Sequence, residues 1–398
     1  MIRINSTAAL ALALFGITTG AVMAQPFAYV ANGGSNNVSG YSVDPATGAL
    51  APLAGSPFPT GSNPISVKAT PSGKFVYVTN YYANSITGFS LTGTNGILTP
   101  IAGSPFAAGS FPYELSISPS GKFLYAANYG GDGIPGNNIS AFSIDSVTGA
   151  LTQIAGSPYA TGANPISLAF TPSGKYLYVS NAGDDSVSAF FVNSDGSLTQ
   201  VPGSPYAAGS YPFGLAVSPP GKFLYVPNAD SGNISAYRIN GTTGALTPIS
   251  GSPFASPSQP SAVAVTPLGQ FLYAAEGSSS DVSGFAINET TGALTAVQGS
   301  PFPAGNEAQN VTVSSSGQFV YVADYYGGQV SGYSIDASTG VLAQITGSPF
   351  TAGNSPASVG LANPATKASG ALNVSPKPPS LPDHTLASQG DPTFGTRR

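Results

Sequence analysis

The chain has 398 residues, of which only 7% are charged, and its formal net charge is −5. This composition argues against nucleic acid and anionic membrane surfaces as partners, because both need basic stripes or clusters. Cysteine is absent, which excludes disulfides and thiolate metal sites. Gly and Pro number 50 and 36, as expected for many short strands joined by many turns.

The first 24 residues read as a signal peptide. Arg3 supplies a positive charge, residues 8–15 form a short apolar run, and small residues precede Gln25. The run is too short for a membrane-spanning helix. We therefore expect cleavage near Ala24 and a mature protein in the periplasm or outside the cell.

From Phe27 onward, an apolar strand centred on tyrosine recurs seven times, and so does a Gly-Ser-Pro-Phe/Tyr marker. The central residues are Tyr29, Tyr77, Tyr125, Tyr178, Tyr225, Tyr273 and Tyr321, spaced by 48, 48, 53, 47, 48 and 48 residues. Seven copies at this period predict an all-β fold, a seven-bladed β-propeller of four-stranded blades over residues 25–363.

Each repeat divides into four strand signals, here called A to D from the channel outward. The tyrosine strand is B. The A strands are expected at 65–69, 113–117, 166–170, 213–217, 261–265, 309–313 and 357–361. The C strands are expected at 38–43, 86–91, 139–144, 187–192, 234–239, 282–287 and 330–335, and the D strands at segments such as 98–101 and 246–249.

The phase of the repeats predicts how the ring closes. The mature chain starts in a B strand at Phe27, and the last A strand, 357–361, comes at the end. This C-terminal strand can complete the N-terminal blade, so that only short edges remain. We expect a monomer. Residues 364–398 are Pro-rich, contain the single histidine, His384, and are predicted to be a disordered tail.

In a propeller the D-to-A and B-to-C connections share one face, and these loops vary most here. Variable loops on a regular scaffold favour a binding site. The ligand-binding candidates are Tyr81, Tyr129, Asp184, Phe213, Asp324 and Tyr325. One interpretation is a funnel of carboxylates and aromatic rings for a sugar or lactone. The other is a solvated rim whose tyrosines pack on the next blade.

Three glutamates lie outside the repeated turns and are the candidate catalytic residues: Glu114, Glu276 and Glu307. Glu114 replaces a small residue in an A strand, and Glu276 replaces the Asn that usually follows a B strand. Both are expected near the channel mouth. We find no Ser/His/Asp set and no metal motif, and we expect no cofactor. Asp184-Asp185 reads either as a cation ligand or, more commonly, as an acidic loop.

The repeated Ser-Gly-Lys-Phe-Leu-Tyr-Val-x-Asn pattern, followed by Val-Ser-x-Tyr-x-Ile-Asp-x-x-Thr-Gly-x-Leu, resembles the lactonase family of seven-bladed propellers over residues 27–362. That family includes propeller-type 6-phosphogluconolactonases, and it overlaps with the YVTN repeats of secreted and surface proteins. The resemblance implies a propeller and allows a lactonase activity.

The chain departs from the enzymes of this family at their functional motifs. Those enzymes carry Gly-Pro-Arg-His at the start of an A strand and Asn-Glu after the next B strand. The corresponding starts here include Pro112-Tyr113-Glu114 and Pro212-Phe213-Gly214. Two hypotheses follow: an exported binding or interaction module that takes a sugar, a lactone or a protein partner, and a sugar-lactone hydrolase that uses a carboxylate base.

Overall fold

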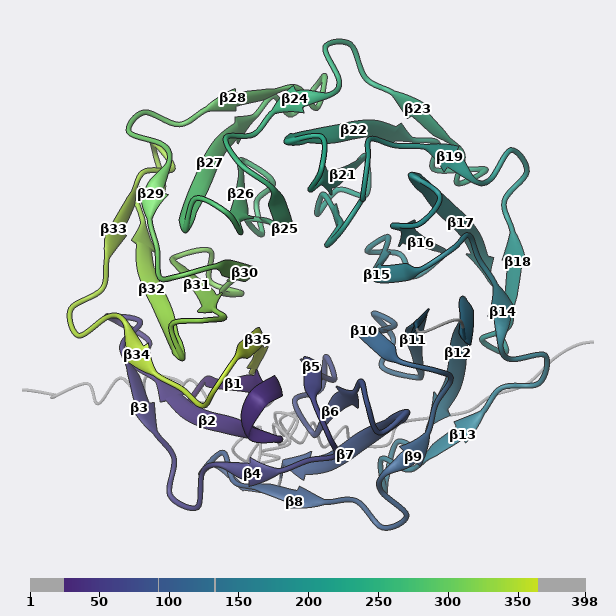
Figure 1. Cartoon of the computed structure of the whole chain (residues 1–398), viewed down its shortest axis with the longest axis vertical. Coiled ribbons are helices and arrows are strands. Elements are labelled where there is room, and N and C mark those ends of the chain that lie inside the picture. Colours follow the sequence, from purple (N-terminus) through teal and green to yellow (C-terminus); the bar gives the residue numbers. More distant parts are fainter. Residues whose placement is uncertain (1–24, 92, 132–133, 364–398) are drawn as a thin grey trace, which may run out of the picture. The chain divides into compact units, whose positions relative to one another are not determined.

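The computed structural model describes residues 25–91, 93–131 and 134–363, without the side chains of 131–135. These residues form seven sheets arranged as the blades of a ring around a central channel (Figure 1). The sequence therefore predicted the seven-bladed propeller correctly. The signal peptide predicted for residues 1–24 and the disordered tail predicted for residues 364–398 lie outside the described residues. Within the described part, no helix is long and apolar enough to cross a membrane.

Each blade has four strands in the order A-B-C-D from the channel outward. The A strands are β5 (Pro64–Ala69), β10 (Pro112–Ile117), β15 (Pro165–Phe170), β20 (Ala216–Val217), β25 (Pro260–Val265), β30 (Ala308–Val313) and β35 (Pro356–Ala362). The B strands are β1 (Phe27–Asn32), β6 (Phe75–Asn80), β11 (Phe123–Gly131), β16 (Tyr176–Asn181), β21 (Phe223–Asn228), β26 (Phe271–Glu276) and β31 (Phe319–Asp324).

The outer half of each blade contains a C and a D strand. The C strands are β2 (Asn37–Val43), β7 (Ser85–Leu91), β12 (Ile134–Ile144), β17 (Ser186–Val192), β22 (Asn233–Ile239), β27 (Asp281–Ile287) and β32 (Gln329–Ile335). The D strands are β3 (Leu50–Pro52), β8 (Leu98–Pro100), β13 (Leu151–Gln153), β18 (Leu198–Gln200), β23 (Leu246–Pro248), β28 (Leu294–Ala296) and β33 (Leu342–Gln344).

A two-residue strand beyond each D strand also pairs with the C strand, which the sequence did not predict. These strands are β4 (Phe58–Pro59), β9 (Phe106–Ala107), β14 (Tyr159–Ala160), β19 (Tyr206–Ala207), β24 (Phe254–Ala255), β29 (Phe302–Pro303) and β34 (Phe350–Thr351). The Gly-Ser-Pro marker explains them, because its serine accepts a hydrogen bond from a C-strand N–H, as Ser56 does from Gly40 at 2.8 Å.

The ring closes as expected. β35 pairs antiparallel with β1, in register from Phe27 opposite Ala362 to Val30 opposite Val359. Blade 1 therefore combines the last described strand with the first four, and blades 2 to 7 follow in chain order, from β5–β9 to β30–β34. A short 3-10 turn, η1 (Gly33–Ser35), joins β1 to β2.

The seven central tyrosines form the core between blades. Each is fully buried, and each hydroxyl donates to the backbone oxygen of a turn glycine in the next blade, over 2.6–2.9 Å. Tyr321 of blade 7 completes the set through Gly48 of blade 1. A buried tyrosine needs such a partner for its polar end, so one residue per repeat supplies both apolar packing and a fixed link to its neighbour.

The A strand of blade 5 is shorter than expected. A strand was predicted over 213–217, but β20 contains only Ala216–Val217. Gly214 instead donates its N–H to the Ser261 carbonyl at 2.9 Å, and its own carbonyl accepts from Val263 at 3.2 Å. The backbone here pairs partly with the A strand of blade 6, and the preceding residue, Phe213, lines the central cavities.

Candidate functional site

Three connected cavities follow the channel. We call them the upper pocket, of about 440 Å³, the constriction, of about 30 Å³, and the lower vestibule, of about 530 Å³. Phe213 and Gln309 line both the upper pocket and the constriction, and Glu114 and Asn310 line both the constriction and the lower vestibule. The two large cavities fall within the roughly 300–1,000 Å³ range of small-molecule sites.

The face with the upper pocket carries the D-to-A and B-to-C loops, and one backbone feature recurs there in every blade. The residue before each A strand has a positive φ, and its carbonyl accepts a hydrogen bond from the start of the B-to-C loop. These residues are Asn63, Phe111, Asn164, Tyr211, Gln259, Glu307 and Ser355, with φ from 40° to 56°. We call this the left-handed position, and three of its side chains, Tyr211, Gln259 and Glu307, line the upper pocket.

Aromatic rings occupy the mouth over blades 2 to 5. Tyr81 packs against Phe111 with ring centroids 5.0 Å apart, and Tyr113 packs against Tyr129 at 6.0 Å and Phe213 at 5.6 Å. Burial, followed by the neighbouring tyrosines, raises the pKa of the Tyr113 hydroxyl. The candidates Tyr81, Tyr129 and Phe213 are thus brought together, but mainly as one packed cluster.

The upper pocket opens beside this cluster, over blades 5 to 7. Tyr211 and Phe213 form one wall, and Asp230, Gln259, Glu307 and Gln309 give the lining its polar groups. Of the candidate carboxylates, this pocket contains Glu307. The Glu307 N–H donates to the Ser280 hydroxyl at 3.1 Å and its carbonyl accepts from Tyr325 at 2.9 Å, so two loops hold its backbone. Burial raises the pKa of its carboxyl.

Glu276 and Asp324 do not reach the mouth, contrary to expectation. Both are fully buried at the ends of their B strands. Glu276 accepts hydrogen bonds from the Ser256 hydroxyl and, at 3.1 Å, from the Ser258 N–H. Asp324 accepts from the Gly305 N–H at 3.1 Å and the Ser331 hydroxyl at 2.7 Å. These carboxylates tie a B strand to the D-to-A loop in front of it.

The other five blades show why these two carboxylates point inward, because each of those blades has a buried Asn at the end of its B strand. In blade 2, Asn80 accepts from the Gly61 N–H at 3.1 Å and donates to the Thr87 hydroxyl at 2.8 Å. Blade 6 has Pro257 where blade 2 has Gly61, and Pro has no N–H to donate. The longer Glu276 reaches the next N–H, that of Ser258, instead. The change from Asn is therefore a structural compensation within the loop.

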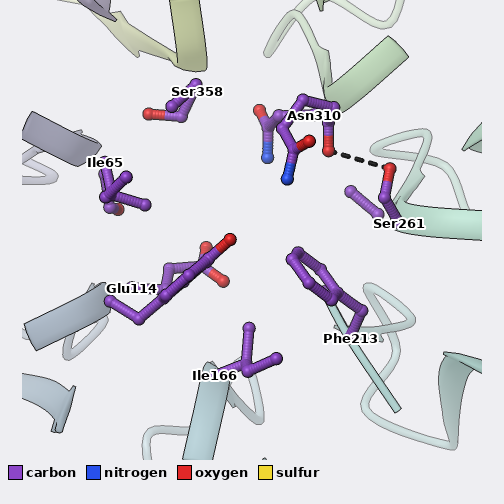
Figure 2. A pocket seen from close by; sticks show the side chains of 13 residues that line it. Ile65, Glu114, Ile166, Phe213, Ser261, Asn310 and Ser358 are labelled. Atoms are coloured by element: carbon purple, nitrogen blue, oxygen red, sulfur yellow. Dashed lines mark hydrogen bonds between the residues drawn. The ribbon is translucent and has the colours of Figure 1, made fainter. Parts of the chain in front are cut away.

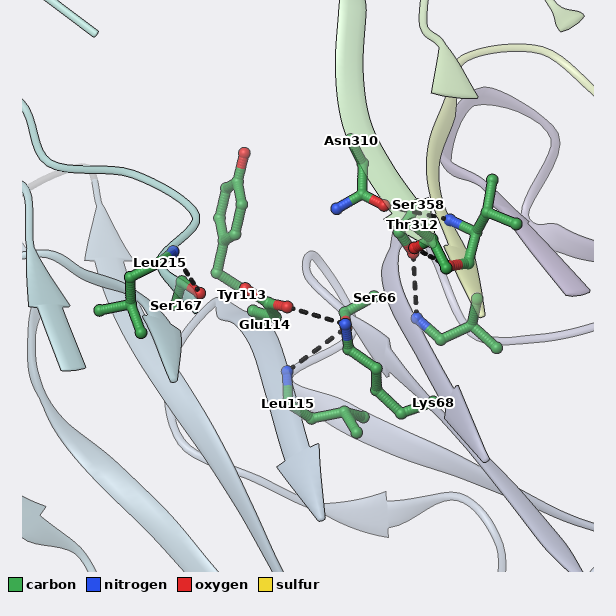
Figure 3. Close-up of polar contacts among 12 residues, drawn as sticks. Ser66, Lys68, Tyr113, Glu114, Leu115, Ser167, Leu215, Asn310, Thr312 and Ser358 are labelled. Atoms are coloured by element: carbon green, nitrogen blue, oxygen red, sulfur yellow. Dashed lines mark hydrogen bonds and ion pairs between the residues drawn. The ribbon is translucent and has the colours of Figure 1, made fainter. Parts of the chain in front are cut away.

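Glu114 lies deeper than expected, in the constriction and the roof of the lower vestibule. Figure 2 shows its side chain pointing into the central cavity together with Asn310 and Phe213. Its carboxylate pairs with the Lys68 ammonium at 3.0 Å, as Figure 3 shows. Lys68 was not among the residues predicted for the site. The sequence does mark it, because Lys68 is a charged residue at an A-strand position where other repeats have small residues, such as Ser116 and Ala169.

The adjacent carboxylates Asp184 and Asp185 hold the backbone of neighbouring loops. The Asp184 carboxylate accepts from the Ala163 N–H at 2.6 Å, and Asp185 accepts from the Tyr211 N–H at 2.9 Å. The Tyr325 ring packs edge-on against Tyr326, a pocket residue, at 5.2 Å. Within the described ranges, no group of three His, Cys, Asp or Glu side chains is placed to hold a metal ion.

The polar side chains Gln259 and Gln309 were also missed. Gln259 occupies the left-handed position of blade 6, and Gln309 is the second residue of β30. The sequence offers little signal for either, because both positions vary among the repeats: the first holds Asn, Phe, Tyr, Glu or Ser in the other blades, and the second holds Ile, Tyr, Phe, Ser or Ala.

Comparisons with known proteins agree on the architecture. The family model "Lactonase, 7-bladed beta-propeller" matches residues 21–168, 158–258 and 248–359. No curated protein matches the sequence. A candidate 6-phosphogluconolactonase from Bacteroides fragilis is 22% identical, with a TM-score of 0.74 over 85% of this chain and 98% of that one.

Two other solved structures have the same fold. The periplasmic gluconolactonase of Pseudomonas aeruginosa is 20% identical, with a TM-score of 0.72 over 86% of this chain and 99% of that one. The hydrazine synthase of Kuenenia stuttgartiensis is 18% identical, with a TM-score of 0.57 over 82% of this chain and 100% of that one. A gluconolactonase and a hydrazine synthase thus share this fold, so the fold alone does not identify a function, and the side chains of the site have to be considered.

Proposed function

Since this chain belongs to the lactonase family of seven-bladed β-propellers, we propose that it binds a neutral sugar lactone in the upper pocket and hydrolyses it with Glu307 as general base. The observation that carries the proposal is the left-handed position. Asn tolerates this backbone, whereas Tyr and Glu are disfavoured there. Tyr211, Gln259 and Glu307 nevertheless occupy it in blades 5 to 7, where they line one pocket.

The lining suits a polar ring with apolar C–H faces. The aromatic wall of Tyr211 and Phe213 can cover one face of a sugar, and the amides of Gln259 and Gln309 can bond to its hydroxyls. Glu307 removes a proton from a water as its oxygen attacks the lactone carbonyl carbon. When the carbonyl re-forms, the ring C–O bond breaks and the ring oxygen takes the proton, which gives an open-chain hydroxy acid.

We propose an unphosphorylated substrate. The described lining of the upper pocket has the carboxylates Asp230 and Glu307 and neither Lys nor Arg. Phosphate recognition uses cationic side chains, and two carboxylates would repel a phosphate group. The signal peptide predicted for residues 1–24 favours action in the periplasm or outside the cell, where phosphosugars are scarce. The periplasmic gluconolactonase with the same fold is consistent with this substrate class.

The second candidate is a binding module without turnover. It is favoured by the same lack of cationic side chains, because no described side chain of the lining can place a positive charge beside a developing oxyanion. It is favoured also by the A-strand starts, such as Pro212-Phe213-Gly214, since none of them carries the Arg-His of the enzymes that this family includes.

Lactone hydrolysis by the purified protein distinguishes these candidates. We expect glucono-δ-lactone to open faster than its spontaneous rate, and 6-phosphogluconolactone to be a poorer substrate. Glu307→Gln should lower kcat/KM by about 10²–10⁴-fold, the usual contribution of a general base. Because burial raises the pKa of Glu307, kcat/KM should decline with falling pH at a higher pH than an ordinary glutamate gives.

Glu289→Gln is the matched control, since Glu289 is exposed on a C-to-D turn. It should leave the rate unchanged. If Glu307→Gln hydrolyses the lactone as fast as the unaltered chain, Glu307 is not the base. If the unaltered chain gives no acceleration but calorimetry detects lactone binding that Glu307→Gln weakens, the binding module is the correct alternative.

A further inference from the structure

The lower vestibule lies at the opposite end of the channel from the upper pocket. The third and fifth residues of the A strands line it and the constriction above it. Nearly all of these are small, which is what creates the space: Ser66, Ser358, Ser167, Gly214, Ala262, Ser116, Ala169, Ala216, Ala264 and Thr312. The large exceptions are Lys68, Glu114 and Asn310.

These exceptions make the vestibule two-sided. Asn310, Lys68 and Glu114 come from blades 7, 2 and 3, on either side of blade 1. The opposite wall, from blades 4 to 6, is formed by Ala169, Ala216 and Ala264. One side therefore presents a cation, a carboxylate and an amide, and the other presents methyl groups.

The charges on the polar side are unusual for this protein. Only 7% of its residues are charged, and Lys68–Glu114 is the one ion pair found among the described residues. The two side chains remain 35% and 19% exposed, so water reaches them. A pair of this kind adds little to stability. Fold stability therefore gives no reason for placing both charges in the channel.

Donors remain available on this side for a ligand. The Lys68 ammonium has three N–H donors, and the contact with Glu114 engages one oxygen at 3.0 Å. The amide oxygen of Asn310 accepts from the Val359 N–H at 3.4 Å, which turns the amide nitrogen toward the channel (Figures 2 and 3).

We propose that the lower vestibule is a second ligand site, for a small anion that carries both a carboxylate and hydroxyl groups. Lys68 binds the carboxylate while keeping its contact with Glu114. Glu114 and Asn310 bind the hydroxyls, and the alanines of blades 4 to 6 cover the carbon chain. A constriction of about 30 Å³ holds a water molecule or two but no sugar acid, so this site is separate from the upper pocket. The proposal does not depend on the proposed lactonase activity.

Calorimetry with gluconate as the probe, at low salt and neutral pH, tests the site. Glucose supplies the hydroxyls without the carboxylate, and acetate supplies the carboxylate alone. We expect gluconate to bind more tightly than either. Lys68→Met should weaken gluconate binding at least 10-fold. Lys74→Met, which removes an exposed lysine from an A-to-B turn, should leave it unchanged.

Two further variants make the result decisive. The double variant Lys68→Met, Glu114→Gln removes both charges, so an unpaired glutamate cannot explain lost affinity, and it too should bind gluconate weakly while melting normally. Glu307→Gln should keep the gluconate binding that depends on Lys68, whatever it does to product binding in the upper pocket. The proposal is wrong if gluconate does not bind at millimolar concentration, if Lys68→Met binds it normally, or if Glu307→Gln removes all binding, which would place the ligand in the upper pocket alone.

Discussion

Asp324 shows how a single substitution alters the chemistry of a repeated position. It replaces an Asn that in blade 2 accepts one hydrogen bond from the D-to-A loop and donates another to the C strand. An ionised carboxylate cannot donate, so here the Ser331 hydroxyl donates to Asp324 instead. A protonated Asp324 can behave as Asn does. Burial raises the pKa of this carboxyl to about 6, against hydrogen bonds from Ser331 and Gly305 that lower it.

This shift predicts that Asp324 destabilises the propeller at neutral pH. The folded chain holds the Asp324 proton more tightly than the unfolded chain, whose ordinary pKa is near 3.8. The contribution of Asp324 to the free energy of unfolding therefore falls as pH rises from about 4 to about 6, by up to about 3 kcal/mol. Asp324→Asn should raise the Tm at pH 7 and remove this part of the pH dependence. Thermal melts of both chains between pH 4 and 8 measure it.

Asp336→Asn provides a control of opposite sign. Asp336 is an exposed turn residue whose pKa is lowered to about 2 by hydrogen bonds from Ser338 and Thr339. Its stabilising contribution is present above about pH 4 and is lost as pH falls toward 2. The Asn variant should therefore melt no higher than the unaltered chain at pH 7. A Tm for Asp324→Asn at or below that of the unaltered chain would contradict the burial argument.

The same residues show how far the sequence could predict the site. The departure from Asn drew attention to Glu276, but the inward direction of its side chain depends on the loop in front, including the missing N–H of Pro257. The left-handed position could not be predicted at Phe111, Tyr211 or Glu307, because these residue types normally avoid positive φ. Only the backbone reveals that seven dissimilar residues share one place.

At the level of the strand, the fully buried B strands carry the strongest constraint. Tyr225 in β21 has no exposed surface, and its hydroxyl donates to the Gly292 carbonyl of blade 6 at 2.9 Å. That glycine has φ +81°, and an added Cβ would lie 2.6 Å from Phe223. Tyrosine, glycine and the preceding aromatic residue thus form one unit that joins two blades.

Tyr225→Ala should lower the free energy of unfolding by about 3–5 kcal/mol, because it removes a large buried ring and its link to blade 6. Tyr225→Phe keeps the ring and loses one hydrogen bond, so it should cost about 1 kcal/mol. Tyr82→Ala, on a loop where the side chain is 64% exposed, should cost less than either. Urea unfolding of the three variants gives the order, and Tyr82→Ala as the most destabilised would refute this account of the core.

Strand prediction succeeded where the repeat was regular and failed where pairing was local. The long apolar B strands and their turn signals fixed the blade pattern. The two-residue strands such as β4 have no periodicity to detect, since a serine hydroxyl and two backbone pairs define them. The shortening of β20 has a similar cause. Gly214 exchanges hydrogen bonds with the A strand of blade 6, and the residues 213–217 themselves do not predict this pairing.

At the level of the whole ring, stability depends on a seam formed by residues far apart in the sequence. β35 pairs with β1 to complete blade 1, and it also contacts β5 of blade 2 and β30 of blade 7. Ser358 accepts from the Val67 N–H at 3.1 Å, and the Thr312 hydroxyl donates to the Val359 carbonyl at 2.8 Å. The same strand lines the constriction through Ser358 and the lower vestibule through Leu361.

Truncation tests whether this seam holds the ring together. Deleting residues 356–398 removes β35 and leaves β1 and the inner side of blade 1 uncovered, so the shortened chain should melt far below the full chain or fail to fold. Deleting residues 366–398 keeps every described strand and should leave the Tm nearly unchanged.

Because a chain that fails to fold gives no melting temperature, a point variant is needed as well. A Cβ added at Gly360 would lie 2.4 Å from the Val67 carbonyl oxygen of blade 2. Gly360→Ala must therefore push β35 away from β5, at a cost of about 1–3 kcal/mol, while Ala357→Gly, on the same strand, adds no atom to the seam and should cost less. Equal Tm values for both truncations, or a Gly360→Ala protein as stable as the unaltered chain, would show that the ring does not depend on its C-terminal strand.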